Sequence, residues 1–274
     1  MPANPFKLLL LVGVLILLIL SAGQSPTDAQ LPFYTDDADT TEKGKFHLEI
    51  FNEQDLLQKA DYPAKRQNNI NSTINYGLTS RLEFDLNAPF LHITYSNASG
   101  IPHPSGFGDT QLGLKYRFHD EKTSSALPAM AVAFYVEYPT GNKRKQLGSG
   151  VVDYYLYGVA QKSFTERTVG RLNGGIVFAG NTSTGLVGVE TARGRVYTVN
   201  GSLVRSFTPR LSLGVELFGA LTGDFRLGRG QLTGQIGGAY SLTKRLTLAF
   251  GIIGGKFAAS PRLGAIVGIA YDFK

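Results

Sequence analysis

The 274-residue sequence has no cysteine and no tryptophan, and only 18% of its residues are Asp, Glu, Lys or Arg. An ordinary soluble domain has about 25%. The absence of cysteine excludes a disulfide scaffold, a Cys-based zinc site and a thiol nucleophile. Low charge combined with 13 Tyr and 17 Phe excludes an intrinsically disordered chain. A mean hydropathy of −0.03 is too low for a bundle of membrane-spanning helices.

Long apolar runs are also absent, with one exception at the N-terminus. Lys7 precedes an unbroken apolar run from Leu8 to Leu20. This run is shorter than the roughly 20 residues that a helix needs to cross a bilayer, and it fits the apolar part of an export signal. Small residues then allow cleavage after Gly23 or after Ala29. The sequence therefore predicts a signal peptide over residues 1–29 of an exported chain. An uncleaved membrane anchor is the alternative.

Beyond residue 30 the apolar residues alternate with polar or small ones. The last segment is apolar at every second position, and segments 81–87, 111–118 and 211–221 alternate in the same way. Such alternation indicates strands, because successive side chains of a strand point to opposite faces. The runs are about ten to twelve residues long, the length that a tilted strand needs to cross a membrane, whereas soluble sandwiches use about five or six. One large apolar face and one polar or small face are typical of a membrane barrel wall.

A repeated turn separates several of these runs. Segments 77–82, 206–211 and 241–246 share the order small residue, apolar residue, Thr, any residue, Arg, Leu, and segment 163–167 is a looser copy. Because Thr, Ser and Pro favour turns, each copy predicts a tight hairpin between two strands.

With these turns as boundaries, we expect twelve strands, although ten or fourteen stay open. Their expected spans are 44–54, 67–78, 81–92, 107–118, 129–138, 150–162, 169–180, 194–207, 211–222, 230–242, 245–256 and 262–273. Short turns would lie at one rim and longer loops at the other, with the short turns periplasmic. The predicted fold is an all-β, transmembrane, antiparallel up-and-down β-barrel over residues 44–274. Residues 30–43 would form an N-terminal periplasmic segment that either plugs the barrel or hangs below it.

Two segments resemble a known family. They are residues 32–46, which begin Pro-Phe-Tyr-Thr-Asp-Asp-Ala-Asp-Thr, and residues 106–118, which read Gly-Phe-Gly-Asp-Thr-Gln-Leu-Gly-Leu-Lys-Tyr-Arg-Phe. The chain resembles the phenol meta-pathway degradation-like family of bacterial outer-membrane barrels there, and in its general layout elsewhere. The resemblance implies a transport barrel of the outer membrane. The C-terminus departs slightly from the usual barrel ending, because Lys274 follows the aromatic Phe273.

Motifs for catalysis or cofactor binding are weak. The four histidines, His47, His92, His103 and His119, form no metal-binding pair by spacing. No serine motif accompanies His92, as a barrel hydrolase would need. The glycine-rich stretches at 234–238 and 251–255 are embedded in alternating runs, where glycine permits close packing, and no helix follows them as in a nucleotide loop. The basic run 143–145 is either a solvated loop or a contact for lipopolysaccharide or an acidic solute. We therefore expect no catalytic, metal or cofactor site, and no nucleic-acid partner for an exported chain.

The inward-facing side chains are the candidate functional residues, because a charge facing lipid at mid-depth costs about 2–4 kcal/mol for Arg or Lys. Strand parity predicts that nine charged residues line the lumen: Glu49, Glu83, Asp85, Lys115, Arg117, Glu137, Asp153, Arg171 and Glu216. They would either set the solute preference of a pore or close it with salt bridges. Tyr135, Tyr155 and Tyr157 share the inward parity and could stack against an aromatic solute.

The function expected from the sequence is passive diffusion of small solutes, aromatic or hydrophobic ones included, across the outer membrane. Two alternatives stay open: a barrel enzyme that acts on lipid or lipopolysaccharide, and a structural barrel with a blocked lumen. The expected partners are outer-membrane lipid and lipopolysaccharide, the barrel-assembly machinery during insertion, and the small-molecule solute.

Overall fold

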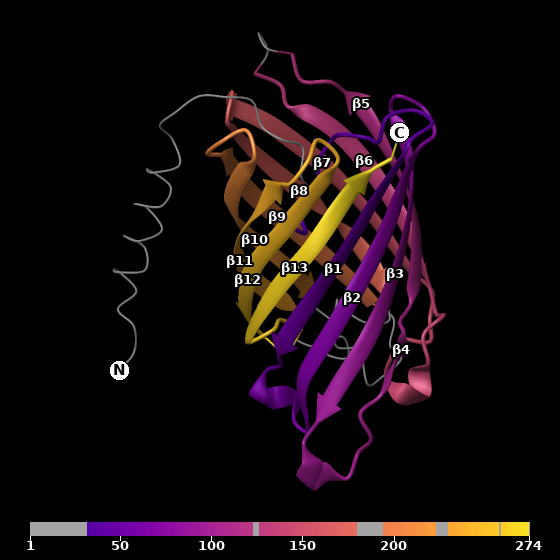
Figure 1. Ribbon diagram of the computed structural model, residues 1–274. Coiled ribbons are helices and arrows are strands. Elements are labelled where there is room, and N and C mark those ends of the chain that lie inside the picture. Colours follow the sequence, from indigo (N-terminus) through magenta and orange to yellow (C-terminus); the bar gives the residue numbers. More distant parts are fainter. Residues whose placement is uncertain (1–31, 123–125, 180–193, 223–229, 258, 274) are drawn as a thin grey trace.

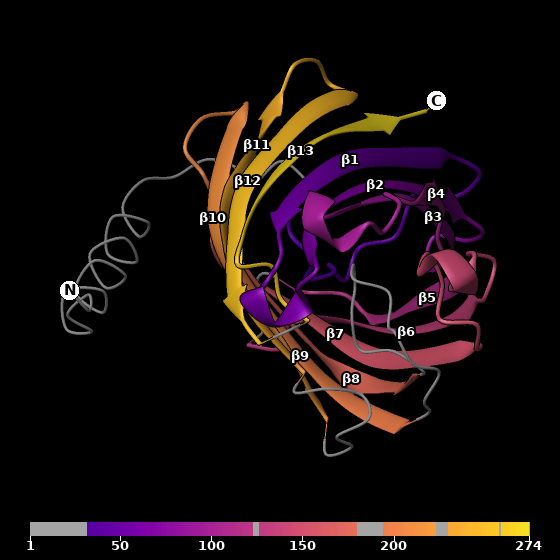
Figure 2. The same ribbon diagram turned by 90° about the horizontal axis from the view of Figure 1, so that it is seen from below.

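The computed structural model describes residues 32–122, 126–179, 194–222, 230–257 and 259–273. In this part of the chain, twelve long strands and one short strand form one antiparallel sheet that closes into a barrel (Figures 1 and 2). The long strands are β1 (Phe46–Leu56), β2 (Ala64–Gly77), β3 (Leu82–Tyr95), β5 (Thr110–His119), β6 (Ala129–Tyr138), β7 (Asp153–Thr165), β8 (Thr168–Ala179), β9 (Gly194–Ser206), β10 (Leu211–Thr222), β11 (Gln231–Ser241), β12 (Leu246–Lys256) and β13 (Leu263–Asp272).

The first and last strands close the barrel. Strand β1 pairs with β13 over its whole length, from Leu56 opposite Leu263 to His47 opposite Asp272. The N–H of Phe273 also donates to the carbonyl of Phe46 at 2.9 Å. Closure pairs the outer edges of β1 and β13, which in lipid would otherwise expose unpaired backbone groups at several kcal/mol each. The predicted fold class, a closed antiparallel barrel of about twelve strands, is confirmed.

The repeated threonine turns form hairpins at one rim of the barrel, which we call the turn rim. The hydroxyl oxygen of Thr79 accepts the N–H groups of Arg81 and Leu82 at 3.1 and 3.0 Å. Thr208 and Thr243 accept the corresponding two N–H groups of their own turns at 3.0–3.2 Å. The threonine thus satisfies two backbone N–H donors that the tight turn of a hairpin leaves free. This is the physical reason for the recurring motif.

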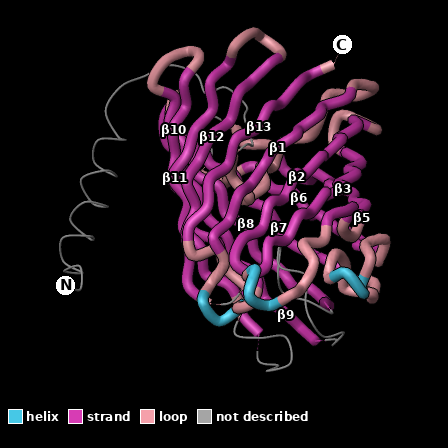
Figure 3. Tube along the Cα trace, turned by 60° about the horizontal axis from the view of Figure 1, so that its bottom comes forward, coloured by secondary structure: helices cyan, strands magenta, loops and turns pink. Residues whose placement is uncertain are grey.

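The opposite rim, which we call the loop rim, has the longer connections. It holds three short 3-10 helices: η1 (Lys59–Asp61), η2 (Asn97–Ser99) and η3 (Lys143–Lys145) (Figure 3). The C-terminus lies at the turn rim, at the top of Figure 1. Among the described residues, no helix combines the length and the apolar character needed to cross a bilayer. The predicted signal peptide, residues 1–29, lies outside the described residues.

Large apolar side chains cover the outside of the barrel. Leu217, Ile252 and Val267 are 57–62% exposed, whereas the inward-facing neighbours Glu216 and Ile253 are at most 4% exposed. Such a contiguous apolar surface is unfavourable in contact with water and is favourable in contact with the hydrocarbon core of a membrane. The alternation in the sequence therefore separates a lipid-facing surface from the lumen.

One predicted strand is interrupted. The expected span 107–118 breaks into β4 (Ser105–Phe107), which pairs with β3, and β5, which starts at Thr110. Between them the Asp109 carboxylate accepts the N–H of Gly141 at 2.9 Å and of Ser149 at 2.6 Å. The break therefore holds the β6–β7 loop against the barrel. Strand β1 also begins two residues later than expected, because Gly44 has a φ of +78° and turns the chain into the strand.

Candidate functional site: the lumen and its N-terminal segment

The predicted lumen residues all project into the barrel. Seven of them are at most 8% exposed: Glu49, Glu83, Asp85, Lys115, Asp153, Arg171 and Glu216. Glu137 and the three tyrosines line a cavity in the lumen, and Arg117 forms an ion pair with a residue of the N-terminal segment. The charges are thus placed where strand parity expects them.

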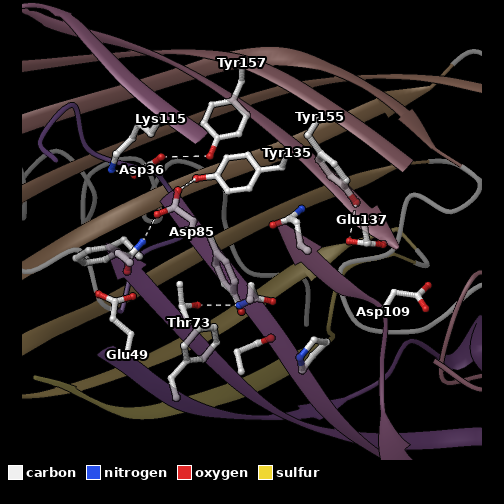
Figure 4. Close-up of a pocket in the computed structure, with 18 of the residues that line it drawn as sticks. Asp36, Glu49, Thr73, Asp85, Asp109, Lys115, Tyr135, Glu137, Tyr155 and Tyr157 are labelled. Carbon is white, nitrogen blue, oxygen red and sulfur yellow. Dashed lines mark hydrogen bonds and ion pairs between the residues drawn. The ribbon is translucent and has the colours of Figure 1, made fainter. Parts of the chain in front are cut away.

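Three tyrosines form one side of that cavity (Figure 4). The rings of Tyr135 and Tyr157 stack with centroids 5.7 Å apart and planes 6° from parallel. The Tyr135 hydroxyl donates to Asp85 at 2.7 Å, and the Tyr155 hydroxyl donates to Glu137 at 3.1 Å. These bonds fix the rings, so the lumen presents rigid aromatic surface beside carboxylates.

Residues 32–43, which we call the lumenal segment, lie inside the barrel. Of the two arrangements that the sequence left open, a plug and a free periplasmic tail, the structure has the first. Phe33 is 4% exposed and its ring packs on Gly214, where a Cβ would lie 2.9 Å from the ring. Pro32 packs on Gly237 in the same way, at 2.7 Å. The inward glycines of β10 and β11 thus provide the room in which the segment begins.

Strands β10 and β8 then bind the backbone of the segment. The Glu216 carboxylate accepts the N–H of Tyr34 at 3.0 Å and both the N–H and the hydroxyl of Thr35 at 2.5 Å. Asn173 accepts the Asp36 N–H at 2.6 Å and donates to the Asp36 carbonyl at 3.0 Å. Thr35 is fully buried. Bonds of this kind satisfy an extended segment that has no strand partner at this point.

Lys115 of β5 is the centre of the charge pairing. Its Nζ lies 3.1 Å from Asp36, 3.5 Å from Asp37 and 3.1 Å from Glu83, and its side chain is only 4% exposed. Arg171 reaches Asp37 from β8 at 3.8 Å. A buried lysine is tolerated only when its charge is compensated in this way. Two of the three compensating carboxylates belong to the lumenal segment, so the wall charge and the segment depend on each other.

A second contact set lies nearer the turn rim. Arg117 binds Asp39 at 2.8 Å, and the Gln161 amide donates to the same carboxylate at 2.8 Å. The Thr41 N–H donates to Glu83 at 2.5 Å. At the end of the segment the Gly44 N–H donates to the Gly77 carbonyl at 2.7 Å, which anchors the chain to β2 before β1 begins.

The pKa values of the two adjacent carboxyls of the segment are shifted in opposite directions. Burial raises the pKa of Asp36, and Lys115 offsets this only in part. Burial acts in the same sense on Asp37, but Lys115, Arg171 and the N–H of Asp39 outweigh it and lower the pKa of Asp37 below its ordinary 3.8. The docked segment therefore favours the charged form of Asp37 more than that of Asp36.

The lumenal segment lies between two cavities. One, of about 320 Å³, extends toward the loop rim and is lined by Asp36, the three tyrosines, and polar side chains of β2, β3 and β5. The other, of about 400 Å³, is at the turn rim and is lined by Asp37, Asp39, Lys244 and Arg245, among others. Asp36 and Asp37 point into different cavities, so the segment constricts the lumen between them.

The other sequence candidates do not gather into a site. Among the described residues there is no group of three His, Asp or Glu side chains that could hold a metal ion. On the outer face, His92 Nδ1 lies 2.6 Å from Ser105 Oγ, a serine brought there by the β3–β4 pairing and without a motif in the sequence. No carboxylate of the described chain bonds to either residue, so this pair lacks the orienting group of a hydrolase.

A family model described as "Putative MetA-pathway of phenol degradation" matches residues 35–273, which include most of the lumenal segment and the whole barrel. The chain belongs to this family. The suspected membership in the phenol meta-pathway family is thereby confirmed. No curated protein matches the chain significantly.

Solved structures of other proteins share the fold of this chain. An outer membrane channel from Pseudomonas putida F1 is similar, with a TM-score of 0.71 and 17% identity over 88% of this chain and 100% of that one. A KdgM porin in complex with disordered oligogalacturonate has a TM-score of 0.54 and 14% identity over 83% of this chain and 99% of that one. A NanC porin has a TM-score of 0.54 and 8% identity over 82% and 100%. The phenol-degradation family member described here thus has the fold of bacterial outer-membrane barrels.

Sequence reasoning named the charged partners of the lumenal segment as lumen residues but missed its uncharged partners, Asn173 and Gln161. Asn173 was not among the candidates because it is uncharged, although it has the same inward parity as Arg171. A signal for docking was present, since residues 36–42 contain four acidic side chains and strand parity places the cations Lys115 and Arg117 inward.

Proposed function

We propose that this protein is an outer-membrane channel that passes small solutes by passive diffusion, and that the lumenal segment is its constriction. The observation that carries the proposal is the pair of cavities inside a closed barrel, one on each side of the segment. The fold shared with the Pseudomonas putida F1 outer membrane channel supports it. Passive diffusion along such a path requires no cofactor and no energy-coupling element.

The solutes we propose are small molecules with an aromatic ring and a polar group. The stacked Tyr135 and Tyr157 offer ring surface, while Asp85 and Glu137 accept hydrogen bonds beside it. A cavity of about 320 Å³ is at the lower end of the range for small-molecule sites, roughly 300–1,000 Å³. The family description, with its reference to phenol degradation, agrees with this class.

Reconstituted protein tests the channel. We expect the full mature chain to give stepwise single-channel currents in planar bilayers, and the Phe33→Ala variant, whose segment loses its buried ring, to give larger ones. Absence of current from both proteins would contradict the channel. In liposomes, Tyr155→Ala should change the influx of a phenolic solute relative to that of a sugar of similar size. An equal flux of both solutes in wild type and variant would count against the aromatic preference.

A structural barrel with a blocked lumen is the second candidate, because the lumenal segment is buried and paired on both sides. A blocked barrel would give no current from the wild type at any voltage, and its unfolding stability would be that of an ordinary outer-membrane barrel.

We also propose contact of the barrel with lipopolysaccharide, and with the barrel-assembly machinery during insertion. Binding of detergent-solubilised lipopolysaccharide to the Lys143–Lys145 loop would test the first of these.

A further inference from the structure

Four polar side chains on β1 and β2 form a buried cluster that the channel proposal does not use. Glu53, Asp55, Gln67 and Asn69 are 2–7% exposed. Asp55 is opposite Gln67 in the strand register, and Glu53 is opposite Asn69. Opposite residues on one face of an antiparallel pair have Cβ atoms about 4.5–5.5 Å apart. The four side chains therefore meet at one place on the lumen wall, near the loop rim.

Three side-chain oxygen atoms of this cluster have no hydrogen-bond donor. Asp55 Oδ1, Gln67 Oε1 and Asn69 Oδ1 are buried and accept no hydrogen bond. Glu53 accepts a bond from the hydroxyl of Tyr34 in the lumenal segment, and its carboxyl also lies within hydrogen-bond reach of the Asp55 carboxyl. Throughout the described chain, no Lys, Arg or His forms an ion pair with Glu53 or Asp55. Buried acceptors and carboxylates without compensation are costly, so a positive ligand would be strongly favoured there.

The surroundings of the cluster are apolar. On one side Leu91 and Ile93 of β3 are in register with Asn69 and Gln67. On the other side Ile266 of β13 is in register with Glu53, and Gly264 is in register with Asp55. The glycine makes room for the carboxylate, since a Cβ at Gly264 would lie 2.2 Å from Asp55 Oδ1. These apolar side chains offer no donor that could satisfy the three acceptors.

We propose that Glu53, Asp55, Gln67 and Asn69 bind a hard divalent cation, Ca²⁺ in the first place. Ca²⁺ takes six to eight oxygen ligands from carboxylates and amide carbonyls, in flexible geometry. Two carboxylates and two amide oxygens supply such a set and balance its two positive charges, and the cluster contains no nitrogen or sulfur ligand of the kind that Zn²⁺ prefers. Because Tyr34 contacts Glu53, the bound cation would also fix the start of the lumenal segment.

Equilibrium dialysis against ⁴⁵Ca²⁺ tests the site in full mature protein refolded in lipopolysaccharide-free detergent and stripped with EDTA. We expect one Ca²⁺ per wild-type chain, and at least tenfold weaker binding by the double variant Glu53→Gln/Asp55→Asn. The matched control is Asp85→Asn/Glu137→Gln, which removes two inward carboxylates outside the cluster and should bind Ca²⁺ as the wild type does. Folding of each variant is checked by the gel-mobility shift that an unheated barrel shows. Asn69→Leu, which removes one oxygen and no charge, should weaken binding as well.

Three results would overturn the proposal. The first is uptake by the wild type no higher than the level of empty micelles, which would indicate a shared proton between the two carboxyls. The second is wild-type affinity in the cluster variant, which would place the cation elsewhere. The third is an equal loss of binding in the control, which would indicate attraction by the lumen charge as a whole. In the supporting case, Ca²⁺ also raises the unfolding temperature of the wild type and leaves that of the cluster variant unchanged.

Discussion

Lys115 Nζ lies 3.1 Å from Asp36 Oδ1, although 79 residues separate the two positions in the sequence. Lys115 belongs to the barrel wall and Asp36 to the lumenal segment, so this contact forms only when the segment is docked in the lumen.

Lys115→Met should release the segment. The change leaves Asp36, Asp37 and Glu83 without their shared cation, and breaking a buried ion pair costs about 3–5 kcal/mol. We expect larger single-channel currents and a lower unfolding temperature. Lys65→Met is the control, because Lys65 is exposed near the loop rim and forms no ion pair in the described chain. Unchanged currents in Lys115→Met would show that the segment is held by its other contacts.

Phe33→Ala should expose the segment to reagents. Truncating a buried Phe costs about 3–5 kcal/mol, and Phe33 is 4% exposed on Gly214. Because the chain has no cysteine, a single Thr35→Cys substitution reports accessibility: maleimide labelling should be slow in an otherwise wild-type chain and at least tenfold faster with Phe33→Ala. Phe164→Ala, at a position 63% exposed on the outside, should leave the rate unchanged. Fast labelling of Thr35→Cys alone would contradict a docked segment.

Asp37→Asn should loosen the segment more than Asp36→Asn. Lys115 and Arg171 lower the pKa of Asp37 despite its burial, so docking favours its charge. Burial raises the pKa of Asp36, so docking disfavours the charged form of Asp36. The contribution of Asp37 is fully present above pH 3.8 and is lost as the pH falls through its lowered pKa. Labelling of Thr35→Cys at neutral pH should be faster with Asp37→Asn than with Asp36→Asn. The reverse order would show that the shorter contact of Lys115 with Asp36 dominates.

Ile252→Arg should destabilise the barrel according to its depth. Ile252 is in the middle of β12 and 62% exposed toward lipid, and arginine at the bilayer midplane costs about 2–4 kcal/mol. Leu263→Arg, at the loop-rim end of β13, should cost about 0–1 kcal/mol. The free energy of unfolding by urea in liposomes measures both. Equal costs at the two positions would mean that the apolar surface does not lie in lipid as described.

The strands were predictable because their signal is local. In β13, for example, residues 263, 265, 267 and 269 are exposed and the residues between them are buried, as period two requires. The break at Asp109 was not predictable, since it depends on loop N–H groups 32 and 40 residues away. The same limit applies to the lumen. Parity placed Glu216 inside, but only the closed barrel brings its carboxylate to Thr35, 181 residues earlier.

The anchor of the lumenal segment has a kinetic consequence. The Gly44 N–H bonds to the Gly77 carbonyl, and the Gly77 N–H donates to the Lys45 carbonyl, so the end of the segment is part of the barrel wall. A segment that leaves its contacts remains on a short tether, where the effective concentration of a binding group is on the order of millimolar. Rebinding is then intramolecular and independent of protein concentration. Open periods of the channel should accordingly be brief, and a soluble copy of the segment would compete poorly for the empty wall.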